Sequence, residues 1–194
     1  YREHNWEGAM GEVLAEYFPG RGCDRDLIIS GLNSGFPWHE SSKYYPELRD
    51  ARQWWKAVNR VFVRIFLSLG LSMADAGRLS EKVRPQYLSI DKWKLYSDSI
   101  HVLHGLQDLG FQQYLVSNHV PELPEILKTL NIHHFFKGVF VSSLVGYNMP
   151  NPLIIGKSEP YLLSRDYVYV FGVLYDSDIL MAREMGKTGI LVRA

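Results

Sequence analysis

Short apolar runs that alternate with helical patterns fill the second half of the chain. The runs span residues 113–116, 138–141, 167–171 and 189–192, and each predicts a strand. Between them, apolar residues recur every three or four positions, which is the spacing of one helix face. Strands that alternate with helices predict a parallel sheet with both faces covered. We therefore expect a three-layer α/β core over residues 94–194.

The first half of the chain has the pattern of helices joined by loops. Apolar residues within 54–69 fall at spacings of three and four, so they predict one buried helix face, and Gly70 is expected to end that helix. Ser72 is a predicted N-cap of the next helix, with Asp75 at its third helical position. Because proline has no backbone N–H, Pro85 is expected to kink or end that helix.

Two polar residues stand where the first of the predicted strands ends. Ser117 and Asn118 directly follow the apolar run 113–116. In parallel sheets, ligands bind beyond the carboxyl ends of the strands, so chemistry is expected at these residues. Structural alternatives exist for both: Ser117 could cap a helix that begins near Pro121, and Asn118 could hold the turn.

Charge and cysteine content limit the classes of partner. Lys plus Arg and Asp plus Glu number 21 each, so the chain has no broad electrostatic reason to bind nucleic acid or an anionic membrane. No apolar run approaches the roughly 20 residues that span a bilayer, and no signal peptide is visible. Cys23 is the single cysteine, which excludes an internal disulfide and fits residence in the cytoplasm.

Several segments occur together in the order and spacing of a known family. The second half resembles the haloacid dehalogenase-like (HAD) hydrolases, and the first half resembles the helical cap of HAD phosphatases related to phosphoglycolate phosphatase. The segments that carry this resemblance are Leu115–Asn118, Ser142–Pro152, Phe171–Gly172, Asp178–Ile179, Gly186 and Leu191–Val192, with Gly35–His39 and Gln53–Trp55 upstream.

The resemblance implies a Rossmann-like parallel sheet at residues 94–194, preceded by a helical cap at residues 1–93. It also implies a hydrolase that acts as a phosphatase on a small phosphorylated metabolite. The family mechanism begins with attack by an Asp on the phosphorus, passes through an aspartyl-phosphate and uses Mg²⁺ to offset phosphoryl charge.

The resemblance also implies a role for each candidate residue. Ser117 would donate a hydrogen bond to the phosphoryl group, and Asn118 would orient the nucleophile loop. Asp178 would be a Mg²⁺ ligand, although it could instead cap the helix that follows. Trp38 and His39 lie in the cap loop, where they would select the substrate or simply pack the cap.

The nucleophile motif of the family does not occur in these residues. Members open with a strand that ends in Asp-x-Asp-Gly-Thr, and the nearest similar segment is 27–35. That segment would put Gly31 and Asn33 where the two Asp residues belong, so we reject it. In the family this strand lies between those that here end at Val116 and Phe171. We expect a strand upstream of the given residues to fill that slot, the alternative being another segment of the chain.

Two further positions depart from the family in ways that matter for chemistry. Met149 replaces the lysine that neutralises phosphoryl charge, and Val173 replaces the first acid of the last motif. Lys157 comes eight residues later than the missing lysine, and we take it as a surface residue. With Asp178 as the one matching acid, Mg²⁺ is expected to bind weakly or not at all.

Residues 152–164 should form a helix by their position in the family pattern, but Gly156 and Pro160 interrupt them. An interior proline costs about 3 kcal/mol, so this helix should be short, broken or displaced.

Two readings of the function therefore remain open. The first is a HAD-like hydrolase, of phosphatase type by resemblance, with an incomplete catalytic set. The alternative is a catalytically inactive relative that binds a ligand or partner, which the substitutions Met149 and Val173 favour. A halide-removing relative would need no Mg²⁺, but it too requires the missing Asp.

Overall fold

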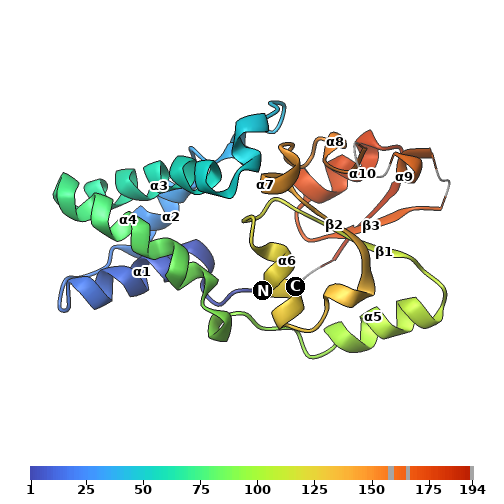
Figure 1. Cartoon of the computed structure of the whole chain (residues 1–194), viewed down its shortest axis with the longest axis horizontal. Helices are drawn as coiled ribbons and strands as arrows, with labels where there is room; N and C mark the ends of the chain where they lie inside the picture. Colours follow the sequence, from blue (N-terminus) through green and yellow to red (C-terminus); the bar gives the residue numbers. More distant parts are fainter. Residues whose placement is uncertain (157–159, 165–166, 193–194) are drawn as a thin grey trace. The chain divides into compact units, whose positions relative to one another are not determined.

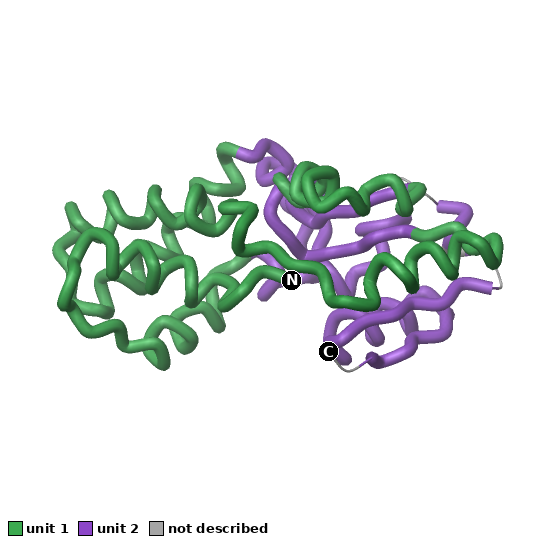
Figure 2. Tube along the Cα trace, turned by 90° about the horizontal axis from the view of Figure 1, so that it is seen from below, with its two compact units in different colours: residues 1–36, 52–113, 122–137 green, residues 37–51, 114–121, 138–194 purple. Residues whose placement is uncertain are grey.

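The chain folds into two compact units that interleave along the sequence (Figure 2). The computed structural model describes residues 1–156, 160–164 and 167–192. Unit 1 comprises residues 1–36, 52–113 and 122–137, and unit 2 comprises residues 37–51, 114–121 and 138–194. The expected division into a helical cap at residues 1–93 and an α/β core at residues 94–194 stays a prediction. Within the described ranges, no helix combines the length and apolar character of a bilayer span.

Unit 1 is helical. Its helices are α1 (Asn5–Tyr17), α2 (Arg25–Leu32), α3 (Ala51–Ser68), α4 (Met73–Leu88), α5 (Ser99–Asp108) and α6 (Leu123–Thr129), with 3₁₀ turns η3 (Ile90–Lys92) and η4 (His133–Phe135) (Figure 1). The predicted buried face of α3 is confirmed, and it consists of Trp54, Trp55, Val58, Val61, Phe62, Ile65 and Phe66. α1 packs against α4, where the rings of Trp6 and Tyr87 stack with centroids 3.6 Å apart.

The predicted helix boundaries near residue 70 are confirmed. Gly70 follows α3 with a φ of +79°, a conformation that glycine adopts without the strain that a Cβ would introduce. The Ser72 hydroxyl accepts a hydrogen bond from the Asp75 backbone N–H at 3.1 Å and so caps α4.

Pro85 does not end its helix, because α4 continues through Pro85 to Leu88, and the expected alternative of a kink at Pro85 stays a prediction. Pro85 lies near the carboxyl end of α4, where its missing N–H removes one bond from the last turns only. Tyr87 is 3% exposed and stacks on Trp6, which anchors this last turn in the core of unit 1.

Unit 2 is built from short strands and short helices. Its elements are η1 (Pro37–Glu40), η2 (Pro46–Arg49), most of β1 (Gln113–Ser117) and β2 (Phe136–Val141), then α7 (Ser142–Val145), α8 (Leu153–Gly156), α9 (Tyr161–Ser164), β3 (Tyr169–Gly172), the π-helical turn η5 (Tyr175–Ile179), α10 (Leu180–Glu184) and β4 (Thr188–Leu191). All four predicted strands are present, and no strand end differs from the expected one by more than two residues.

The four strands form two separate sheets within the described residues, which corrects the expectation of a single sheet. β1 pairs with β2, and β3 pairs with β4 in parallel, with Val170 opposite Gly189. Both sheets pack on one apolar cluster that includes Phe140, and Val116 of β1 and Val170 of β3 contact it from their own sheets. No described strand joins β1 to β3, which agrees with the gap expected between them.

The segment 152–164 is broken as expected. α8 ends at Gly156 and α9 begins at Tyr161, and each is four residues long. Lys157 lies outside the described residues, so its expected surface position stays a prediction.

Candidate functional site

Unit 2 contains all five residues that the sequence predicts for the site. Ser117 is the last residue of β1, and Asn118 follows it. Asp178 lies in η5, in the turn after β3. Trp38 and His39 lie in η1.

The Ser117 hydroxyl makes no hydrogen bond to the described residues. The structural alternative, in which Ser117 caps the next helix, is wrong, because α6 begins at Leu123 with Glu122 at the N-cap position. The hydroxyl at the carboxyl end of β1 can therefore donate to a bound anion.

The Asn118 side chain holds the turn around Met149. Its Oδ1 accepts a hydrogen bond from the Met149 backbone N–H at 2.7 Å, and its Nδ2 donates to the Met149 carbonyl oxygen at 3.1 Å. One amide thus satisfies both backbone groups of a residue 31 positions along the chain. This geometry supports the role in which Asn118 fixes the local backbone.

Met149 has an uncharged thioether side chain, which is 8% exposed and belongs to the apolar cluster of unit 2. A lysine placed there would enter the cluster together with Phe140 and Ile154 unless the backbone moved. The substitution of the family lysine is therefore accommodated by the packing around it.

The Asp178 carboxylate is engaged by its own turn. Its Oδ2 accepts hydrogen bonds from the backbone N–H groups of Val173 at 2.9 Å and Leu174 at 3.0 Å. Its Oδ1 accepts a hydrogen bond from the Ser177 hydroxyl at 2.7 Å. Gly172 permits this arrangement, because an added Cβ would collide with the Asp178 side chain. Asp178 therefore stabilises the turn after β3.

The described residues do not fit Mg²⁺. The cation prefers several well-placed oxygens in near-octahedral geometry. Asp178 already receives three hydrogen bonds, and Val173 offers no oxygen from its side chain. No group of three or more His, Cys, Asp or Glu side chains that could hold a metal occurs in the described part of the chain.

A strap of residues 37–51 is fastened to the turn after β2 within unit 2. The Tyr45 backbone N–H donates to the Gly146 carbonyl oxygen at 2.9 Å, and the Arg49 Nε donates to the Leu144 carbonyl oxygen at 3.1 Å. The Tyr44 ring stacks on Tyr147 with centroids 4.5 Å apart. These contacts fix the strap that carries Trp38 and His39.

Trp38 and His39 lie side by side in this strap, with their rings edge to face and centroids 6.0 Å apart. Trp38 is half-buried and His39 is exposed. Their part in substrate selection stays a prediction.

His119 is a residue that sequence reasoning missed. Its backbone N–H donates to the buried Ser142 hydroxyl at 3.3 Å, which links the end of β1 to α7. Burial lowers the pKa of His119 to about 4, so the imidazole is neutral near pH 7. Its place beside Ser117 and Asn118 was the one available signal.

The segment that we rejected as a nucleophile strand is helical, which confirms the rejection. Leu27 to Leu32 belong to α2, whose N-cap Asp24 accepts a hydrogen bond from the Leu27 backbone N–H at 3.0 Å. No described strand carries an Asp at its carboxyl end.

Comparison with known proteins supports the resemblance. No family model matches the chain. A curated relative, the glyceraldehyde 3-phosphate phosphatase of Methanopyrus kandleri, is 34% identical over 103 residues, which are 52% of this chain and 44% of the relative. The match thus spans less than half the length of that relative.

Solved structures show the same fold at low sequence identity. The HAD-hydrolase YfnB of Bacillus subtilis, bound to magnesium, has a TM-score of 0.66 at 19% identity, over 96% of this chain and 82% of that one. A HAD phosphatase of Thermococcus onnurineus has a TM-score of 0.58 at 18% identity, over 97% of this chain and 76% of that one. The L-2-haloacid dehalogenase of Xanthobacter autotrophicus has a TM-score of 0.63 at 15% identity, over 97% of this chain and 72% of that one. The fold is therefore HAD-like α/β, and the resemblance to HAD hydrolases is confirmed.

Proposed function

We propose that this protein is a HAD-like hydrolase of the phosphatase type and that its ligand is a small phosphorylated molecule. The observation that carries the proposal is the Ser117 hydroxyl, which ends β1 without a hydrogen bond to the described residues. Such a hydroxyl can donate to a phosphoryl oxygen. The phosphatase named among the relatives supports the choice of a phosphate ester.

The chain's own residues supply binding and positioning. Ser117 donates to the phosphoryl group, and Asn118 fixes the neighbouring turn through the Met149 backbone. Trp38 and His39 contact the remainder of the substrate from the strap, and the helical residues 1–93 act as a cap that excludes water. The nucleophilic carboxylate is not among these groups, so binding alone does not lead to hydrolysis.

A second candidate, a binding protein without catalysis, is favoured by two observations. Met149 is buried in the apolar cluster, and the Asp178 carboxylate is occupied by its own turn. The two candidates share a phosphate-ester site and differ in whether a nucleophile from outside the given residues completes it.

The proposal is tested by titrating a general aryl phosphate into the protein and following backbone amide shifts by NMR. We expect saturable shifts at Ser117 and Asn118, and at least about tenfold weaker binding in Ser117→Ala, because a hydrogen bond to a charged group is lost. Ser97→Ala is the matched control, since Ser97 is exposed and makes no hydrogen bond to the described residues. Equal affinity in both variants would overturn the proposal.

A further inference from the structure

Ser142, the residue directly after β2, contacts the turn that follows the Ser117 hydroxyl. Ser142 is the first residue of α7 and is 3% exposed. Its hydroxyl oxygen accepts a hydrogen bond from the His119 backbone N–H at 3.3 Å. His119 lies two residues beyond Ser117, so this contact joins the carboxyl ends of β1 and β2.

Two contacts hold the turn after β1 against the segment that follows β2. The Asn118 side chain bonds both backbone groups of Met149, and the His119 N–H bonds Ser142. Asn118 and His119 are the two residues next to Ser117. Because these contacts fix the backbone at the end of β1, they also limit the directions that the Ser117 hydroxyl can take.

The position of Ser142 is fixed by its own surroundings. Its carbonyl oxygen accepts a hydrogen bond from the Gly146 backbone N–H at 2.7 Å, which closes α7. Val141, which precedes Ser142, and Val120, which follows His119, are both completely buried. Close packing on both sides leaves this backbone little freedom, so Ser142 can serve as a fixed acceptor for the turn.

The neighbouring Ser143 separates this contact from the general effect of a buried hydroxyl. Ser143 is 2% exposed, and its hydroxyl has no hydrogen-bond partner among the described residues. The two adjacent serines of α7 share their size and their burial, and they differ in the contact with His119. A comparison of the same substitution at both positions therefore isolates the contact.

We propose that Ser142 is a positioning residue of the phosphate-ester site, whose hydroxyl holds the turn that directs the Ser117 hydroxyl toward the ligand. Ser142 acts through His119 and Ser117 and does not itself bind the ligand. Only the fraction of molecules with the turn in place binds the ester, so a loosened turn weakens the apparent affinity. This inference rests on the proposed function and adds a residue to its site.

The contact is tested first without ligand, by hydrogen exchange of the His119 backbone amide. In Ser142→Ala this amide should exchange at least about tenfold faster than in the unmodified chain, because the N–H loses its acceptor. In Ser143→Ala it should exchange at the unmodified rate. Equal rates in the two variants would overturn the inference.

The effect on the site is tested by NMR titration of phenyl phosphate into the full chain, followed at the Ser117 and Asn118 amides. Ser142→Ala should weaken binding at least about threefold, and Ser143→Ala should leave it unchanged. Ser142→Thr and Ser142→Val form a second pair of nearly equal shape, in which threonine alone keeps the hydroxyl. Threonine should bind the ester at least about threefold more tightly than valine, which a role in packing alone would not produce.

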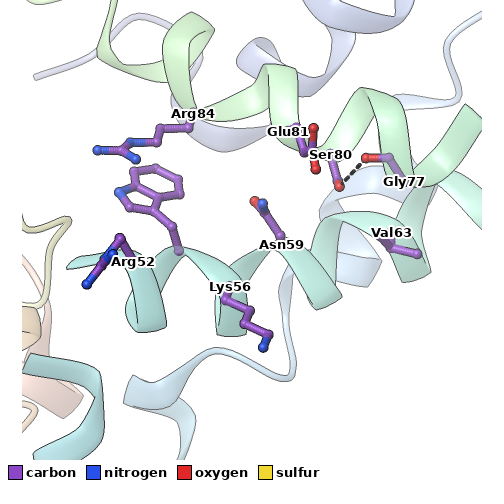
Figure 3. A pocket seen from close by; sticks show the side chains of 9 residues that line it. Arg52, Lys56, Asn59, Val63, Gly77, Ser80, Glu81 and Arg84 are labelled. Atoms are coloured by element: carbon purple, nitrogen blue, oxygen red, sulfur yellow. Dashed lines mark hydrogen bonds between the residues drawn. The ribbon is translucent and has the colours of Figure 1, made fainter. Parts of the chain in front are cut away.

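Cations in unit 1 are a second possible source of anion binding, so the titration needs a control there. Arg52, Lys56 and Arg84 line one groove between α3 and α4, where Lys56 points away from α4 (Figure 3). Lys56→Gln should change neither the affinity nor the shifts at Ser117. A loss as large as that in Ser142→Ala would show that the ester binds outside the proposed site, and the inference would fail.

The remaining outcomes separate the inference from the function on which it rests. If the unmodified chain binds phenyl phosphate and Ser142→Ala binds it as tightly as Ser143→Ala does, the inference fails and the proposed function stands. Equal affinities of Ser142→Thr and Ser142→Val would also overturn the inference alone. Absence of binding by the unmodified chain would overturn both, and faster exchange in Ser142→Ala would then show that the contact holds the turn for structural reasons only.

Discussion

Gly172 is the residue on which the Asp178 turn depends. A Cβ at this position would displace the Asp178 carboxylate from the backbone N–H groups of Val173 and Leu174. Gly172→Ala should therefore lower the free energy of unfolding by about 1–3 kcal/mol, measured by urea denaturation. Gly22→Ala is the control, because no atom lies within 4 Å of its added Cβ. Equal urea midpoints for the two variants would contradict this account of the turn.

His119 should make stability depend on pH. Its pKa in the folded protein is about 4, against 6.5 in the unfolded chain, so the unfolded state binds more protons between these values. The contribution of the neutral imidazole to stability is fully present above pH 6.5 and is lost as the pH falls through about 4. At that point the loss in the free energy of unfolding reaches about 3 kcal/mol. His119→Gln should flatten this part of the curve of unfolding free energy against pH. An unchanged slope in the variant would show that the imidazole is solvated in the folded state.

Val173 limits Mg²⁺ binding at the turn after β3. Its side chain is 51% exposed, so Val173→Asp can add a carboxylate there without disturbing the core. Calorimetric titration of Mg²⁺ should show weak or no binding by the unmodified chain and tighter binding by the variant. Tight binding by the unmodified chain that is lost in Asp178→Asn would mean that other oxygens complete a site.

At the residue scale, the sequence predicted where the candidate site residues lie better than it predicted which groups they bind. Ser117 and Asn118 were predicted at a strand end, and they lie there. The partners of Asn118 and Asp178 could not be predicted, because they are backbone groups whose positions depend on turn geometry. A side-chain pattern contains no direct signal for such contacts.

At the element scale, Gly146 fastens the strap of residues 37–51. Its φ is +87°, and an added Cβ would lie 2.9 Å from the Tyr44 ring and 3.1 Å from the Tyr45 carbonyl oxygen. Gly146→Ala should release the strap, which we expect to appear as at least about tenfold faster hydrogen exchange at the Tyr45 N–H. Gly110→Ala is the matched control, since its φ is +81° but nothing lies within 4 Å of the added Cβ.

If both glycine variants changed Tyr45 exchange equally, backbone strain rather than contact with the strap would be the cause. The positive φ is common to both positions, so their difference isolates the contact.

Helices were predicted well in position and less well in environment. α5 spans Ser99–Asp108, where Ile100, Leu103 and Leu106 recur at the three-residue spacing of a helix face, yet none of its residues is buried, and Ile100 is 48% exposed. Periodicity reports which residues share a face but not what covers that face. α4 also continues past Pro85 to Leu88, because packing of Tyr87 maintains its last turn.

At the scale of the whole molecule, the α/β class followed from alternating strands and helices, and the fold is HAD-like. The division into two small sheets did not follow, because strand pairing depends on contacts between distant residues. The apolar cluster shared by the two sheets keeps them in one unit without a strand that pairs with both in the described residues.

The set of functional groups in the whole molecule distinguishes ligand binding from hydrolysis. Binding needs groups that unit 2 contains, above all the Ser117 hydroxyl, whereas hydrolysis needs a carboxylate nucleophile that the given residues do not place at a strand end. The central claim is therefore a phosphate-ester site that binds its ligand without turnover in these 194 residues.

The most direct test is release of inorganic phosphate from a general aryl phosphate by the 194-residue chain in the presence of Mg²⁺. The account predicts no release above background, together with ester binding that Ser117→Ala weakens. Turnover by the unmodified chain that Ser117→Ala abolishes would contradict it, because the chain would then contain a complete catalytic set.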